Sequence, residues 1–153
     1  MVEYSVTERR LVLVASCMAI FVNPLVGTML NLALNAIGSD LDCSAHQLGW
    51  IASIFFIVAV VAMVPAARMA DIFGKRRVFL AGTAIASVAL VLSMFAQDIY
   101  MLYVFRGLTG VGTACISSTS VSMIADVYPR DQRGSALAWN TACVYVGASI
   151  GPS

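Results

Sequence analysis

The chain has 153 residues, of which 60% are hydrophobic and only 11% are charged. A soluble globular domain carries about a quarter charged residues, so this composition excludes a compact soluble domain with a polar surface. The net charge of +1 comes without a clustered basic face, which argues against nucleic-acid binding.

Five apolar segments follow one another along the chain. Each reaches the roughly 20 residues that a helix needs to cross about 30 Å of hydrocarbon. The alternating pattern of a membrane barrel is missing, so helices are the expected spanning form. We predict an all-α integral membrane protein with a single transmembrane domain over residues 1–153. The predicted helices span about residues 11–37, 48–67, 78–97, 102–125 and 134–153.

The first segment holds polar side chains in apolar company. Asn31 and Asn35 share a helix face at i, i+4, and Thr28 joins Asn31 at i, i+3. Polar groups inside a membrane face a cavity or a partner helix, so these three residues are candidates for the substrate or proton path. Hydrogen bonding between packed helices explains them equally well. Pro24, near the middle of the segment, predicts a kink.

The link at residues 68–77 gathers cations around one carboxylate. Asp71 can accept a hydrogen bond from a helix N-terminus or from an arginine, and either bond would hold two helices in one arrangement. Gly74 permits a sharp turn. A generic cytoplasmic loop explains the cations but not the placement of Asp71 and Gly74. The cations are Arg68, Lys75, Arg76 and Arg77.

The fourth segment carries one charge, Arg106. An arginine one turn inside an apolar helix costs several kcal/mol unless it is paired or hydrated, so Arg106 is a candidate for the substrate or proton path. The alternative is that its long side chain extends to the nearby outer interface. In the fifth segment, Gly147 and Gly151 form a GxxxG face for close helix packing. Pro152 follows and is expected to bend that helix.

The basic residues are distributed on one side. Eight of the nine Lys and Arg residues precede the first segment or lie in the second and fourth links, while the first and third links contain none. The positive-inside rule then places the N-terminus in the cytoplasm. We expect a multi-pass protein of the inner or plasma membrane, in contact with the lipid bilayer.

The four cysteines show no metal-ligand spacing, and the sequence offers no nucleophile–base pair. We therefore expect no metal, no cofactor and no enzymatic activity.

Four stretches together resemble motifs of the major facilitator superfamily of transporters. Residues 67–80 (ARMADIFGKRRVFL) resemble its loop signature, G-x-L-a-D-r-x-G-r-k, with Ala67, Met69 and Ile72 as departures. The resemblance implies that this loop latches two halves of a transporter in one access state, with Asp71 as a gating residue. The matching positions are Asp71, Gly74, Lys75 and Arg76.

Residues 102–114 resemble the fourth-helix motif, l-x-x-x-R-x-x-q-G-x-g-a-A, with Thr109 in place of the glutamine. In proton-coupled members the matching arginine, here Arg106, is implicated in proton transfer or a charge relay. Residues 144–153 resemble the start of the antiporter motif, g-x-x-x-G-P-x-x-G-G, which tends to mark exporters. Its matches here are Gly147, Gly151 and Pro152.

Residues 28–35 resemble the first-helix motif of the fourteen-span drug–proton antiporters, D-x-T-v-v-n-v-A-l-P. Thr28, Asn31, Ala33 and Leu34 match, while Asn35 stands in place of the proline. The acidic residue of the motif is also absent, because its position holds Val26. The motif's obvious proton carrier is therefore missing from this chain.

The resemblance implies an N-terminal piece of a transporter, with five helices of a six-helix half and the C-terminal helices missing. The expected function is secondary-active efflux of drugs or small metabolites, with a proton as the coupling ion. Two alternatives stay open. One is a facilitator or symporter of a polar metabolite, and the other is a truncated remnant that does not transport.

Overall fold

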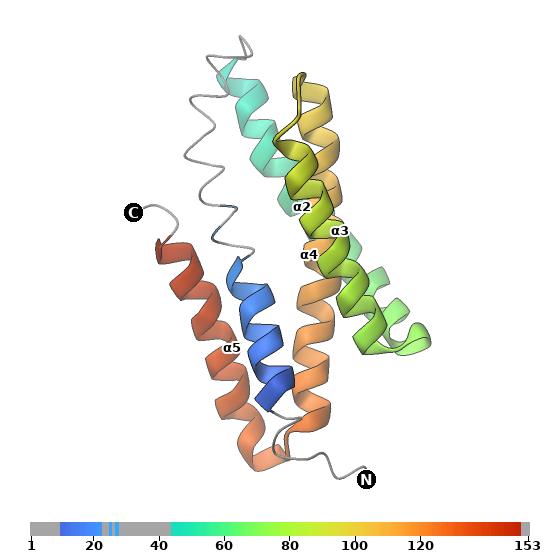
Figure 1. The fold of residues 1–153 in the computed structure, drawn as a ribbon, viewed down its shortest axis with the longest axis vertical. Helices are drawn as coiled ribbons and strands as arrows, with labels where there is room; N and C mark the ends of the chain where they lie inside the picture. The colour runs from blue at the N-terminus through green and yellow to red at the C-terminus, as the bar shows by residue number, and fades with distance from the viewer. Residues whose placement is uncertain (1–9, 23–24, 26, 28–43, 151–153) are drawn as a thin grey trace.

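The computed structural model describes residues 10–22, 25, 27 and 44–150. Within this part of the chain, helices are joined by short links and no strand occurs, which confirms the all-α fold class. The helices, in chain order, are an N-terminal helix (Arg10–Val22), α2 (Ala45–Phe73), α3 (Lys75–Ser93), α4 (Ile99–Val127) and α5 (Arg130–Ile150) (Figure 1).

The helix ends differ from those predicted. α2 runs from Ala45 to Phe73, well beyond residues 48–67, and α3 starts at Lys75 and ends at Ser93 rather than spanning 78–97. An apolar run measures the part of a helix that lies in hydrocarbon. The helix itself continues through charged residues until its backbone is capped or broken. The prediction of a ten-residue loop at 68–77 was therefore wrong.

Gly74 alone separates α2 from α3. Its φ of +95° lies in the region that favours glycine. The Gly74 N–H donates to the carbonyl of Ala70 at 3.0 Å, and so closes the last turn of α2. The α4–α5 reversal is similarly short, because Tyr128 and Pro129 are the residues between these helices.

Three of the described helices, α2, α3 and α4, are long and apolar enough to cross a membrane. α5, which covers most of the fifth predicted span, does not meet this criterion within the described residues. Its first turn carries Asp131 and Arg133, which lower its apolar character. The N-terminal helix is apolar but shorter, and the rest of the first predicted span, including Pro24, lies outside the described residues.

Helix α4 packs against both α2 and α3. A Cβ atom at Gly110 would lie 2.8 Å from the Phe55 carbonyl oxygen of α2. A Cβ atom at Gly112 would lie 2.7 Å from the Gly82 carbonyl oxygen and from the Ala86 nitrogen of α3. The two glycines thus let α4 approach the backbones of two neighbours, as small residues do in membrane helix packing.

The ends of the helices that carry the basic links lie together. Figure 1 shows the start of the N-terminal helix, the α2–α3 turn and the α4–α5 turn towards one end of the bundle. An ion pair between Lys75 at the start of α3 and Asp126 at the end of α4 joins two of these segments. The one-sided distribution of cations in the sequence therefore corresponds to one end of the structure.

We predict that Gly112→Ala lowers the thermal stability of the protein, because the added methyl group would overlap the α3 backbone. Overpacking of this kind costs about 1–3 kcal/mol. Gly107→Ala is the matched control, since its nearest contacts would be ordinary ones to Ile54 and Val58 at 3.7 and 3.8 Å. Thermal unfolding in detergent checks both variants, and equal melting temperatures would contradict the close α3–α4 contact.

Candidate functional site

Arg106 is a buried residue of α4 that lies against α2. Only 2% of the residue is exposed, and its guanidinium carbon stands 5.1 Å from the centroid of the Phe55 ring on α2. This is a cation–π arrangement. The Nε atom is buried and has no hydrogen-bond partner within the part of the chain that the structure describes. The guanidinium therefore retains an unused donor.

The position of Arg106 in α4 differs from the one-turn depth expected from the sequence. The helix begins at Ile99, so Arg106 lies about 10 Å from its start at 1.5 Å per residue. Its burial against α2 is not the extended, exposed arrangement that contact with the outer interface would require. Among the described side chains, the ion pair is the one between Lys75 and Asp126, and Arg106 takes no part in it.

The threonines near Arg106 are bound to their own helix. The Thr109 hydroxyl donates to the Phe105 carbonyl at 2.8 Å, and the Thr113 hydroxyl donates to the Thr109 carbonyl at 2.9 Å. Thr109 occupies the position where the resembling motif has glutamine. Arginine stays protonated in proteins, so its side chain does not release or take up a proton. What Arg106 offers is a fixed positive charge with directional donors.

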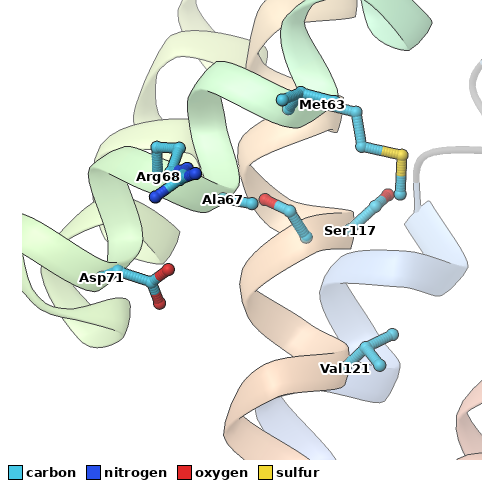
Figure 2. Close-up of a pocket in the computed structure, with 8 residues that line it drawn as sticks. Met63, Ala67, Arg68, Asp71, Ser117 and Val121 are labelled. Carbon is cyan, nitrogen blue, oxygen red and sulfur yellow. The ribbon is translucent and has the colours of Figure 1, made fainter.

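A second cluster surrounds the α2–α3 turn. Asp71 is exposed and lies in the last turn of α2, rather than in a loop as predicted. With Arg68 it borders a pocket of about 430 Å³ between α2 and α4 (Figure 2). Most of the wall is apolar. The lining residues are Met63, Val64, Ala67, Arg68, Asp71, Ser117, Ser118 and Val121.

The charge pair at this end of the bundle joins α3 to α4. The Lys75 ammonium lies 2.5 Å from a carboxylate oxygen of Asp126 and 3.5 Å from the Ser122 carbonyl. Both side chains are partly exposed, at 28% for Lys75 and 53% for Asp126. A solvated pair of this kind contributes little stability. Its effect is to fix the position of Lys75, while Gly74 sets the turn before it and Arg76 is exposed.

Several predicted positions cannot be placed. Thr28, Asn31 and Asn35 of the first segment, and Gly151 and Pro152 of the fifth, lie outside the described residues. Gly147 is described: a Cβ atom there would lie 2.5 Å from the Phe21 carbonyl oxygen, so it serves close helix packing. The proposed antiporter motif stays a prediction.

Sequence reasoning missed two partners. Phe55 gave no signal, because one aromatic residue among many apolar ones does not reveal what it faces. Asp126 did carry a signal, since it is an acidic residue in a link on the same predicted side as Lys75. The two residues are 51 positions apart, and helix packing brings them together.

Comparison with known proteins identifies the fold and the family. A family model described as Major Facilitator Superfamily matches residues 16–153. The crystal structure of a bacterial homologue of the human lysosomal transporter Spinster, in an inward-facing and occupied conformation, superposes with a TM-score of 0.91. It is 23% identical to this chain, and the match covers 97% of this chain and 32% of that one.

Curated relatives agree with this result. The riboflavin transporter RibZ of Clostridioides difficile (strain 630) is 23% identical over 145 residues, which cover 95% of this chain and 32% of RibZ. The multidrug export protein EmrB of Haemophilus influenzae (strain ATCC 51907 / DSM 11121 / KW20 / Rd) is 29% identical over 142 residues, covering 93% and 28%. The chain thus spans about a third of the length of these relatives. It belongs to the Major Facilitator Superfamily.

Proposed function

We propose that this chain supplies the first helices of a secondary-active exporter of drugs or small metabolites. A transporter function follows from the family. Efflux is favoured by the motif resemblances and by relatives named as multidrug proteins, including EmrB and the Mycobacterium tuberculosis protein Stp. The rest of the transporter would come from helices beyond those of this chain, because the relatives are about three times longer.

The buried Arg106 carries this proposal. A fixed cation in the membrane part of a protein is expensive and marks a substrate or ion pathway by default. Arg106 has a buried Nε donor that no described residue satisfies, and its guanidinium carbon lies over the Phe55 ring. We assign Arg106 to the central cavity, where it contacts the substrate or the path of the coupling proton. Thr28, Asn31 and Asn35 are the proposed companions on the first helix.

Removal of the Arg106 side chain should abolish transport in the complete transporter. A buried charged contact is worth about 2–5 kcal/mol, so Arg106→Ala should reduce uptake into inverted vesicles by about 100-fold or more. Arg106→Lys should rescue poorly, because lysine lacks the planar fork of donors. Arg77→Ala, which removes an exposed cation, is the matched control. Normal transport by Arg106→Ala at equal expression would overturn the assignment.

A second candidate function is a facilitator or symporter of a polar metabolite. It is favoured by the lack of an acidic residue in the described helices away from their ends, because such a residue is the usual proton carrier. RibZ, a relative named for riboflavin transport, is also consistent with it. Transport that persists after a protonophore collapses the pH gradient would favour the facilitator. A chain that inserts but is never joined to further helices would be the non-transporting remnant.

We further propose that Asp71 is a gating residue, together with Gly74, Lys75 and Arg76. Asp71 borders the apolar pocket between α2 and α4, on a face that the described helices leave open. A helix from the remainder of the transporter would close over this pocket in one access state. The Asp71 carboxylate would accept a hydrogen bond from that helix, and the Lys75–Asp126 pair joins the start of α3 to the end of α4 nearby.

Asp71→Asn should shift the balance of access states without unfolding the protein. A hydrogen bond to a charged group is worth about 1.5–3 kcal/mol, which corresponds to a change of roughly 10-fold or more in that balance. The labelling rate of a cysteine introduced into the cavity measures the shift. Asp131→Asn, an exposed change in the first turn of α5, is the control. Equal labelling rates in both variants would contradict the gating role.

The proposed orientation, with a cytoplasmic N-terminus in the inner or plasma membrane, is tested by labelling. In a background without native cysteines, Ser44→Cys and Gln132→Cys place exposed thiols at opposite ends of the bundle. A membrane-impermeant maleimide should label the first variant in intact cells, and the second only after the membrane is opened. The reverse pattern would invert the orientation.

A further inference from the structure

Two cysteines from different helices meet where the N-terminal helix runs beside α5. Figure 1 shows the two helices side by side, the N-terminal one in blue and α5 in red. The Cys17 and Cys143 thiols lie within hydrogen-bonding reach of one another. Both are reduced and half-buried. The proposed transport path makes no use of either residue.

The packing one turn further along holds this pair in register. Phe21 and Gly147 each follow the cysteine of their own helix by four residues, about one helical turn. The two backbones are in close contact there, since a Cβ atom at Gly147 would lie 2.5 Å from the Phe21 carbonyl oxygen. The helices therefore run in the same direction with two successive matched contacts. The backbones that carry the two cysteines cannot move apart unless this contact opens.

The two helices that carry the cysteines also pack against α3 and α4. Ile20 on the N-terminal helix belongs to a buried cluster with Phe79, Ala86 and Ile116, and Val144 of α5 packs against that cluster. Ile20, one turn after Cys17, and Val144, next to Cys143, thus pack against residues of α3 and α4. Cys115 is different: it is buried with Ala66, Ala70 and Val78, away from the pair.

We propose that Cys17 and Cys143 form a dithiol site for trivalent arsenic compounds, in which one arsenic atom bridges the two sulfur atoms. In the reaction with an arsine oxide, two As–S bonds form and the As–O double bond breaks. Both thiol protons leave with the oxygen as water. Arsenic stays trivalent, so the reaction needs neither an oxidant nor a reductant.

Charge selects this class of ligand over soft metal ions. An organic arsenic bound to two thiolates is neutral, whereas a monovalent metal ion bound to the same two thiolates leaves a net negative charge. A net charge inside the membrane part of a protein is costly. A small, apolar arsenical also reaches a half-buried site through lipid. Binding would join the N-terminal helix covalently to α5.

The test uses the full chain, purified in detergent, with phenylarsine oxide as the probe. In a Cys43→Ser, Cys115→Ala background, one arsenical per chain should consume both remaining thiols, as measured by intact mass and maleimide titration. Dimercaptopropanol should restore both thiols. Cys17→Ala or Cys143→Ala should weaken binding by about 100-fold, because the second sulfur no longer acts at high effective concentration.

Equal affinity in the single-cysteine variants, or two arsenicals per chain, would overturn the proposal. A measurement on the unaltered chain keeps the test independent of how the variants fold. Dibromobimane bridges only adjacent thiols, so peptide mapping should recover a cross-link between Cys17 and Cys143. Failure to find it would also refute the site. None of these readouts depends on transport.

Discussion

The close backbone approach of α4 to its two neighbours is the constraint on which the rest of the structure depends. Lipid offers helices little hydrophobic reason to associate, so membrane helices rely on contact between their backbones and small side chains. Gly110 brings α4 against the carbonyl of Phe55 in α2, and Gly112 brings it against the carbonyl of Gly82 in α3. Several hydroxyls of α4, including those of Thr109 and Thr119, donate to carbonyls of their own helix. Polar side chains are thereby accommodated without disturbing the contacts.

The close contact between α4 and α2 also positions the residues of the candidate site. Gly110 follows Arg106 by one helical turn, so the point where α4 touches the Phe55 backbone is adjacent to the guanidinium. The guanidinium carbon of Arg106 consequently lies over the Phe55 ring, 5.1 Å from its centroid. A change that separates α2 from α4 would remove the aromatic support of the charge as well as the packing. Fold and site are therefore coupled through one helix pair.

The sequence predicts the features that depend on composition along the chain. The apolar runs locate the helices, and the distribution of Lys and Arg matches the common end of the bundle. Helix ends are predicted poorly, because hydrocarbon width does not decide where a helix stops. At the α2–α3 turn the backbone of Gly74 decides it. α5 likewise begins at Arg130 and includes polar residues that the predicted fifth span, 134–153, left out.

Contacts between helices could not be predicted from this one sequence. Lys75 with Asp126, Phe55 with Arg106 and Cys17 with Cys143 each join residues that are far apart in the chain. Charge sign makes the first pair plausible in advance. The other two depend on helix rotation and register, which small residues such as Gly110 and Gly147 determine through steric contact. A glycine pattern indicates that a close contact exists but does not identify the partner.

The energetics of Arg106 show why a further partner is needed. On insertion scales an arginine costs about 2.5–3.5 kcal/mol at the centre of a membrane helix, and Arg106 lies between the start of α4 and its centre. A desolvated cation–π contact returns about 2 kcal/mol, so Phe55 offsets part of the cost. The buried Nε donor adds a further penalty of about 1–3 kcal/mol while it lacks an acceptor. Water, a substrate group or residues beyond the described helices would have to offset the rest of this cost.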